Sequence, residues 1–239
     1  MIEAHLLKLR ARDEVSPEEE GAIRGLFTET REVPADRTIV RAGEELSVSL
    51  LLIEGLLCRY KDLRDGSRQI SELHVAGDFA DLHGFTLKRL DHSVLALTRC
   101  RIAVAPHERL KALTREHPHL ARLYWFGTNL DAAIHREWML SLGRRSALSR
   151  AAHLFCELHV RLGLVGLADD AGYALPLTQT DLAECLGLTP VHVNRTLKEL
   201  REGGLVEFRG GRVTIANLDG LRRVGEFDDS YLYLERRTR

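Results

Sequence analysis

Residues 178–200 read TQTDLAECLGLTPVHVNRTLKEL, and this stretch predicts two short helices joined by a tight turn. Thr178 can cap the first helix, because its hydroxyl can accept from a first-turn amide, and an aspartate three positions later suits the positive helix end. Gly187 ends that helix, since glycine adopts the left-handed conformation at little cost. Thr189 caps the second helix and Pro190 fills its first position, where no amide hydrogen bond is lost.

The second helix has an apolar face and a polar face. At about 100° per residue, the apolar side chains that we expect to point inward are Val193, Leu197 and Leu200. The residues of the opposite face are Val191, Asn194, Arg195 and Lys198. Asparagine can read adenine, arginine can read guanine, and lysine suits phosphate. This face therefore favours a helix that lies in the major groove of DNA.

Residues 205–215 read LVEFRGGRVTI and predict a β-hairpin with a Gly-Gly turn. Arg209 and Arg212 flank the turn, where they can reach a phosphate backbone. Two such helices followed by this hairpin predict a winged helix-turn-helix. The plainer alternative is an ordinary helical hairpin whose charged face is merely solvated.

These residues resemble the Crp/Fnr superfamily of bacterial winged-helix regulators, and the resemblance extends from about Arg31 to about Leu234. It implies a homodimer that binds double-stranded DNA at an inverted repeat, with half-sites about 10 base pairs apart, and RNA polymerase as a further partner. The expected base contacts are Val191, His192, Asn194 and Arg195. The expected phosphate contacts are Thr178, Thr189, Lys198, Arg209 and Arg212. Arg195 matches the base-reading arginine of the family, whereas Val191 stands where many members have glutamate, so we expect a different operator.

Composition sets the broad class of the protein. The chain has 239 residues, 44% of them hydrophobic, and a net charge of -1, which suggests one or two domains with a substantial core. Because the bulk charge is near zero, DNA binding must come from a local basic patch. The four cysteines are scattered, as is typical of a reducing cytoplasm. We find neither a signal peptide nor the ~18 apolar residues of a membrane helix, so we expect a cytoplasmic protein without membrane contact.

The N-terminal half carries the pattern of a β-roll. A helix begins at Ser16, and residues 31–106 then hold short apolar runs separated by Gly, Asp and Pro turns such as Asp65-Gly66. Many short strands of this kind predict an antiparallel barrel or double-sheet roll. The stretch resembles the cyclic-nucleotide-binding jelly roll that forms the sensor half of Crp/Fnr proteins.

Helical spacing replaces the strands after Pro106. We expect helices over 107–116, 118–142 and 147–162, a hinge at Gly143-Arg-Arg, a Gly-rich surface loop over 164–176 and a packed tail from Phe227. The apolar stripe of the longest helix predicts a dimer seam, as in the family, formed by Leu120, Leu123, Gly127, Leu130, Ile134 and Trp138. The predicted fold class is α+β, with a jelly-roll sensor domain over 1–117, a dimerisation helix and hinge over 118–143, and a winged helix-turn-helix domain over 144–239.

The resemblance places an effector pocket in the roll, at Gly77, Asp81, Leu82, His92 and Ser93. In nucleotide-binding members a Gly-Glu pair holds the ribose and an Arg-Ser pair holds the cyclic phosphate. Here Asp81-Leu82 and His92-Ser93 stand at those places. A neutral histidine cannot replace the two parallel charged hydrogen bonds of an arginine, so we expect weak or no cyclic-AMP binding.

Other sensing chemistries are less favoured. The N-terminus lacks the cysteines of the iron–sulfur branch, so we expect no iron–sulfur cluster, and Cys58 and Cys100 lie in apolar strands where thiols are usually inert. Haem is an alternative, because the available histidine ligands are His74, His83, His92, His117 and His119. The sequence shows no catalytic or metal-binding constellation, which argues against an enzyme. The competing functions are a ligand-binding module that docks proteins instead of DNA and a regulator without any small-molecule effector.

Overall fold

The computed structural model describes residues 1–238, which form two compact units. The first contains Met1–Lys61, Leu73–Ala133 and the described residues from Tyr233 onward. The second contains Asp62–Glu72 and Ile134–Leu232. Among the described residues, no helix has the length and apolarity to cross a membrane.

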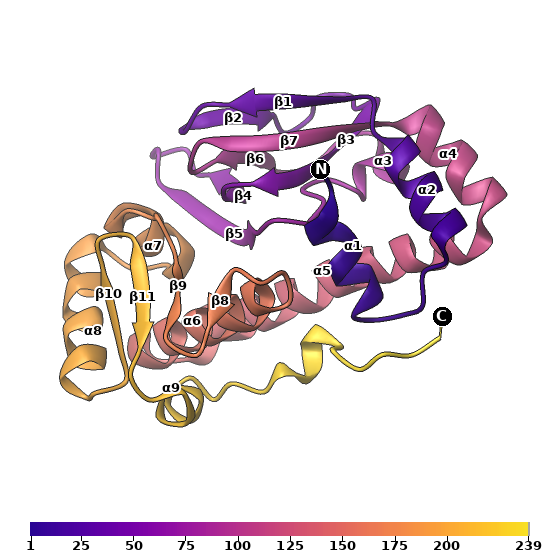
Figure 1. The fold of residues 1–239 in the computed structure, drawn as a ribbon. Coiled ribbons are helices and arrows are strands. Elements are labelled where there is room, and N and C mark those ends of the chain that lie inside the picture. Colours follow the sequence, from indigo (N-terminus) through magenta and orange to yellow (C-terminus); the bar gives the residue numbers. More distant parts are fainter. Residues whose placement is uncertain (239) are drawn as a thin grey trace. The chain divides into compact units, whose positions relative to one another are not determined.

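Two antiparallel sheets form the roll of the N-terminal half (Figure 1). The sheet with the order β1-β7-β3 consists of β1 (Glu29–Val33), β3 (Val48–Glu54) and β7 (Cys100–Pro106). The sheet with the order β2-β6-β4-β5 consists of β2 (Arg37–Val40), β4 (Leu57–Asp62), β5 (Arg68–His74) and β6 (Ser93–Ala96). Leu52, Leu57 and Val94 are fully buried in the core of the roll, because alternate residues of a strand point to the same face. The predicted double-sheet roll is confirmed.

The helices of this half are α1 (Glu3–Arg10), α2 (Pro17–Leu26), α3 (Gly84–Leu87), α4 (His107–Glu116) and α5 (Pro118–Arg144). Ser16 begins α2 as predicted: its Oγ accepts from the Glu19 amide at 3.2 Å, and the Glu19 carboxylate accepts from the Ser16 amide at 2.9 Å. The sequence does not predict α1, because Ile2 stands at its N-cap position and an isoleucine side chain cannot cap a helix. Packing stabilises α1 instead, since Leu6 is fully buried in a core that also contains Ile23 and Leu123.

The structure corrects the predicted dimer seam. Leu120, Leu123, Ile134 and Trp138 are each at most 6% exposed within the single chain, so a second copy cannot reach them. A long helix can carry two stripes, and here the more apolar one packs on its own chain. Gly127 and Leu130, the remaining members, are half-buried. The opposite side of α5, which we call the exposed α5 stripe, consists of Trp125, Asn129, Ala132, Arg136 and Met139.

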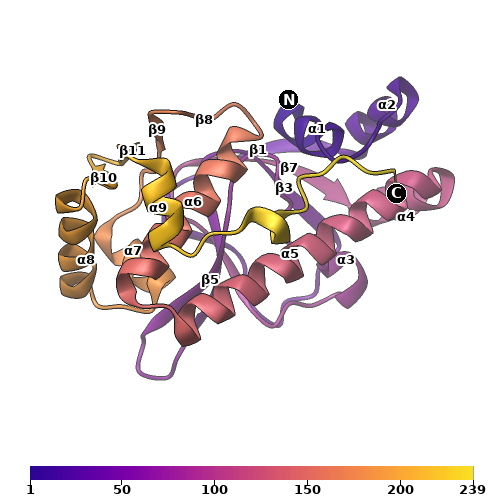
Figure 2. The same ribbon diagram turned by 90° about the horizontal axis from the view of Figure 1, so that it is seen from below.

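The second unit combines helices with a four-stranded antiparallel sheet (Figure 2). Its helical elements are α6 (Ala147–Gly163), α7 (Gln179–Leu186), α8 (Pro190–Glu202), α9 (Leu218–Val224) and the 3-10 turn η1 (Asp229–Leu232). The sheet, in the order β10-β11-β9-β8, consists of β8 (Ala168–Asp169), β9 (Gly172–Ala174), β10 (Val206–Arg209) and β11 (Arg212–Ile215). Tyr173 lies in the core of this unit and donates to the Phe155 carbonyl at 2.8 Å.

Two predictions for this region are wrong. The segment 164–176 is not a surface loop: it contains β8 and β9, because Tyr173 is buried and pairs with Val213 of the wing. The helix α5 also ends two residues later than expected, at Arg144 within the predicted interruption Gly143-Arg-Arg, since one glycine costs a helix only about 1 kcal/mol. The break follows at Ser146, whose Oγ accepts from the Ser149 amide at 3.2 Å and so begins α6.

Candidate nucleic-acid interface

The two helices of the helix-turn-helix begin and end where the sequence predicts. Thr178 forms a capping box with Asp181: its Oγ accepts from the Asp181 amide at 3.1 Å, and its own amide donates to the Asp181 carboxylate at 2.7 Å. Gly187 closes α7 with φ +60°, the left-handed conformation that favours glycine. Thr189 caps α8 by accepting from the His192 amide at 3.3 Å. These local contacts fix the direction in which α8 leaves the turn.

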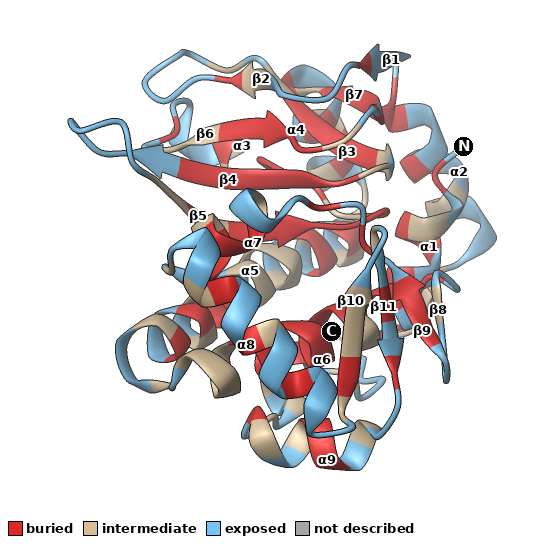
Figure 3. Ribbon diagram, turned by 90° about the vertical axis from the view of Figure 1, so that its left-hand side faces the viewer, coloured by how far each residue is buried: buried red, intermediate tan, exposed pale blue. Residues whose placement is uncertain are grey.

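The two faces of α8 are separated as predicted. Val193 and Leu200 are fully buried, and Leu197 is half-buried. The residues exposed on the opposite side are Val191, Asn194, Arg195 and Lys198, with Val191 80% exposed (Figure 3). His192 is only half-buried and lies at the margin of this face.

One further cation was missed by the sequence analysis. Arg201 is exposed one turn beyond Lys198 and extends the polar face. The spacing of three residues from Lys198 could have identified it, because residues three positions apart lie on the same face of a helix. Lys198 itself forms an exposed ion pair with Glu202 at 3.6 Å, a contact that is easily exchanged for a phosphate.

The wing brings two more cations together. Arg209 and Arg212 are direct partners across the β10–β11 hairpin, and both are exposed. Gly210 and Gly211 form the turn with φ of 59° and 73°, as the predicted Gly-Gly turn requires. Like charges directly opposite one another on a sheet repel, so this arrangement favours a bound anion.

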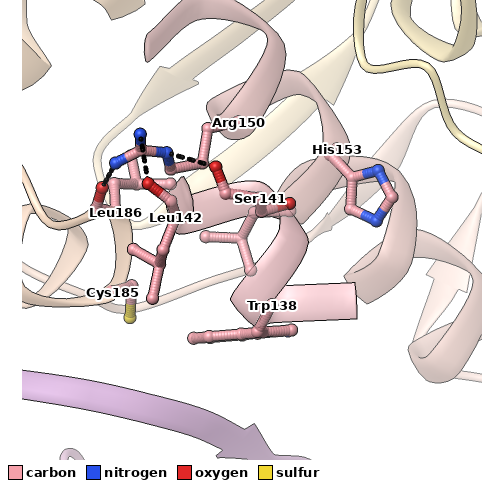
Figure 4. A pocket seen from close by; sticks show the side chains of 8 residues that line it. Trp138, Ser141, Leu142, Arg150, His153, Cys185 and Leu186 are labelled. Atoms are coloured by element: carbon pink, nitrogen blue, oxygen red, sulfur yellow. Dashed lines mark hydrogen bonds between the residues drawn. The ribbon is translucent and has the colours of Figure 1, made fainter. Parts of the chain in front are cut away.

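An unpredicted side chain, Arg150 of α6, holds the carboxyl end of α7, the first helix of the helix-turn-helix, in place (Figure 4). Its Nε donates to the Ser141 carbonyl at 3.1 Å, and its Nη2 donates to the carbonyls of Leu142 and Arg145, both at 3.2 Å. Its Nη1 donates to the Leu186 carbonyl at the end of α7. One cation thus satisfies the carboxyl ends of α5 and α7, where positive charge is favourable. The space beside it measures about 10 Å³, at most one water, so it is not a ligand site.

The C-terminal tail closes the same unit around a buried carboxylate. Glu157 of α6 is fully buried and accepts from Arg161 at 2.8 Å, from Trp138 at 3.1 Å and from the Tyr231 hydroxyl at 2.8 Å. The Tyr231 hydroxyl also lies 3.1 Å from Nε2 of His153. The predicted packed tail is therefore confirmed, and it completes a polar network inside the unit.

Three of the residues expected to form an effector pocket are engaged in contacts within the roll. Asp81 is fully buried, and its Oδ1 accepts from the Leu50 amide at 2.6 Å. His92 Nδ1 pairs with Asp91 at 2.9 Å, and Ser93 Oγ accepts from the Ala42 amide at 3.1 Å. Gly77 and Leu82, in contrast, line a cavity beside α1.

The histidines and cysteines are held in ordinary structural contacts. His119 lies between Glu19 and Asp13, at 2.7 and 3.2 Å, while His74 is buried and His83 packs against His92 with ring centroids 5.3 Å apart. His117 is half-buried. Over residues 1–238, no group of three or more histidine, cysteine, aspartate or glutamate side chains has the arrangement of a metal site. The cysteines are buried thiols, and burial raises the pKa of Cys100 and brings that of Cys156 to about 12, so neither is a reactive thiolate at neutral pH.

Comparison with known proteins agrees with this arrangement. Residues 149–224 match the family model of the Crp-like helix-turn-helix domain, and residues 30–117 match that of the cyclic nucleotide-binding domain. A "Probable transcriptional activator" of Rhizobium leguminosarum is 32% identical over 81% of this chain and 80% of its own. The chain belongs to the Crp/Fnr superfamily. Crp/Fnr proteins are transcription regulators with a DNA-binding helix-turn-helix, and this chain is one of them.

Other Crp/Fnr relatives support the same assignment. The nitrogen fixation regulation protein FixK of Bradyrhizobium diazoefficiens is 33% identical and covers 72% of each chain. The solved structure of FixK2 from Bradyrhizobium japonicum superposes with a TM-score of 0.73 at 25% identity, over 82% of this chain and 96% of that one. In the roll, His92 Nδ1 pairs with Asp91 and Ser93 Oγ accepts from the Ala42 amide, so both residues are engaged with neighbouring protein groups.

Proposed function

We propose that this chain is a homodimeric, sequence-specific DNA-binding regulator that does not respond to cyclic AMP. The observation that carries the proposal is the outward face of α8, where Asn194, Arg195 and Lys198 lie together on a helix capped at its start. A short rigid helix with an amide, a guanidinium and an ammonium on one side suits the major groove. RNA polymerase is the protein partner that such a regulator would contact.

Each exposed side chain has a chemical role in this proposal. Arg195 donates to O6 and N7 of a guanine, and Asn194 pairs with an adenine. Val191 contacts a thymine methyl group, with His192 as a marginal neighbour. Lys198, Arg209 and Arg212 contact phosphates.

The two cap residues, Thr178 and Thr189, differ in whether their hydroxyl group can donate to a phosphate. The Thr178 hydroxyl donates to the Asp181 carboxylate at 2.7 Å, so we assign it a structural role. The Thr189 hydroxyl accepts from an amide and keeps its proton for a phosphate oxygen, so it stays a phosphate contact.

Substitution of Arg195 tests the docking of α8. A selection of bound fragments from a genomic DNA library identifies the operator, and fluorescence anisotropy then measures affinity. Arg195→Ala should weaken specific binding by about 1–3 kcal/mol and relax specificity at one base pair. Lys198→Ala should weaken binding to all DNA sequences alike. It should also reduce the salt dependence of the binding constant by the amount expected for about one phosphate contact. The matched control is Arg115→Ala, an exposed arginine on α4 of the first unit. Specific binding that is unchanged by Arg195→Ala would refute the proposed docking, and no selected fragment at all would favour a module without DNA output.

We infer that the exposed α5 stripe forms the dimer interface. Trp125 and Met139 are 69% and 70% exposed, and with Ala132 between them they repeat every seven residues. This heptad spacing is typical of paired helices. Met139→Glu should convert a dimer to a monomer in analytical ultracentrifugation, whereas Lys111→Glu on the exposed surface of α4 should not. A dimer that survives Met139→Glu with unchanged affinity would show that another surface pairs the copies.

The lack of a cyclic-AMP response is tested directly by calorimetry. Asp81, His92 and Ser93 are engaged in contacts within the roll, and an imidazole ring cannot supply the two parallel hydrogen bonds of an arginine. We expect no binding heat at micromolar cyclic AMP and no change in operator affinity. Micromolar affinity would contradict this part of the proposal without affecting the DNA-binding part.

A further inference from the structure

A cavity in the first unit lies between α1, the turn at residues 77–82 and α5. Its volume is about 80 Å³, and a single water needs roughly 10–15 Å³ of such space, so it can hold a ligand of several heavy atoms. Its apolar walls include Leu9, Phe79, Leu82, Leu123 and Leu130. Three chain segments far apart in the sequence thus enclose one apolar space.

The approach of α1 to this turn is built into the backbone. Gly77 has φ +88°, and a Cβ atom there would lie 2.7 Å from the backbone of Ala4. Only glycine allows both this conformation and this distance. The Gly77 carbonyl also accepts from His5 of α1 at 3.0 Å. The cavity wall that α1 supplies is therefore held in a fixed position.

His5 and Tyr124 line this cavity, and each has a buried polar atom without a hydrogen-bond partner among the described residues. These atoms are Nε2 of His5 and the hydroxyl of Tyr124, on side chains only 5% exposed. A buried polar group without a partner is costly, and native proteins usually provide one. The ring centroids of His5 and Tyr124 are 5.9 Å apart, so one small ligand can reach both.

The protonation states define what these two atoms can bind. Burial lowers the pKa of His5 to about 4, so the ring is neutral at pH 7. Because the Gly77 carbonyl can only accept, Nδ1 carries the proton and Nε2 offers a lone pair. Burial raises the pKa of Tyr124, which stays a neutral phenol and offers a proton. The cavity therefore presents one acceptor and one donor.

The charged residues at the cavity are already engaged with other protein groups. Lys8 pairs with Asp78 at 2.5 Å, and Asp131 pairs with Arg59 at 2.8 Å. Arg12 donates to the Lys8 carbonyl at 3.2 Å and lies over the ring of Phe126 at 6.0 Å. A charged ligand would have to displace one of these contacts, so an uncharged ligand fits best.

We propose that this cavity is a binding site for a small uncharged molecule with an apolar body and one hydroxyl group, of the size and class of a phenol. The hydroxyl donates to Nε2 of His5 and accepts from the hydroxyl of Tyr124, while the ring contacts Phe79 and Leu123. The cavity shares Gly77 and Leu82 with the expected effector pocket, but His92 and Ser93, where the cyclic phosphate was expected, do not line it. It goes beyond the proposed DNA-binding function and does not depend on it.

The test uses the full-length chain and three probes of similar shape: phenol, toluene and benzoate. Isothermal titration calorimetry should show saturable binding of phenol, with toluene and benzoate at least tenfold weaker. Tyr124→Phe should reduce phenol affinity about three- to tenfold, the effect of one hydrogen bond. Without ligand, this variant should melt at the same or a higher temperature than the wild type, because it removes an unpaired buried hydroxyl. The matched control, Tyr60→Phe, alters a tyrosine whose hydroxyl pairs with Thr38 at 2.9 Å elsewhere in the roll.

Three results would overturn the proposal. Equal affinity for phenol and toluene would show an apolar cavity without polar recognition. No binding of phenol would show a site filled by water alone. Unchanged phenol affinity in Tyr124→Phe, with far-UV circular dichroism confirming the fold, would exclude the hydroxyl contact. Operator binding is measured separately on α8 variants, so failure here leaves the DNA-binding proposal untouched.

Discussion

Replacement of Arg150 by methionine should destabilise the second unit. The guanidinium donates to four backbone carbonyls, those of Ser141, Leu142, Arg145 and Leu186. Four hydrogen bonds at about 1 kcal/mol each, less about 2 kcal/mol for ordering one arginine side chain, leave about 2 kcal/mol. We therefore expect Arg150→Met to lower the free energy of unfolding by about 2 kcal/mol.

Arg150→Lys separates charge from geometry. A lysine keeps the positive charge at the two helix ends but loses the planar fork that reaches acceptors in different directions. We expect it to recover about half of the loss, roughly 1 kcal/mol. The exposed Arg144, in the last turn of α5, provides the control substitution Arg144→Met, which should change little.

Fluorescence of Trp138 provides the assay, because this side chain is buried beside Arg150. The chain has two tryptophans, so urea unfolding is followed in a Trp125→Phe background in which Trp138 alone reports. A loss below about 0.5 kcal/mol, the usual size of a surface substitution, would refute the argument that Arg150 joins the ends of α5 and α7.

Three further substitutions test other parts of the structure. Burial raises the pKa of Asp81 from 3.8 to about 7, so between pH 4 and 7 the folded state holds a proton that the unfolded state has lost, and the free energy of unfolding should fall by up to about 4 kcal/mol as the pH rises. In urea titrations at pH 5 and 8, Asp81→Asn should flatten this pH dependence. A wild type whose stability increases with pH would contradict the prediction. Tyr231→Phe removes a donor to the buried Glu157 carboxylate and should lower the melting temperature, at a cost of about 1–3 kcal/mol. Gly187→Ala forces alanine to φ +60° and should cost about 1–2 kcal/mol, whereas Gly21→Ala in open space on α2 should stabilise by up to about 1 kcal/mol.

Features that depend on residues close together in the chain were predicted correctly from the sequence. Thr178 and Thr189 accept from amides three positions later, and the Gly187 amide donates to the Ala183 carbonyl four positions earlier. These caps could therefore be placed without knowledge of the rest of the chain. The alternation of apolar residues in the roll and the Gly-Gly turn of the wing have the same short range. The exposed face of α8 followed directly from its helical period.

Features that depend on distant partners were missed. Arg150 donates to carbonyls of two separate segments, residues 141–145 and Leu186, and no spacing within the sequence predicts this. The strands β8 and β9 are short, and only the pairing of β9 with β11 and of β8 with β9 distinguishes them from a Gly-rich loop. In α5 the periodicity located the apolar stripe, but the choice between the protein's own core and a second copy depends on what lies against it.

The buried carboxylate of Glu157 has a practical consequence for shortened versions of this protein. Removal of the last ten residues would delete Tyr231 and leave the carboxylate with one donor fewer in an apolar interior. A version that ends with α9, where the recognisable DNA-binding module stops, would therefore have a less stable core. Isolated versions of this module should keep the chain through Leu232, and affinity tags are better joined beyond that point.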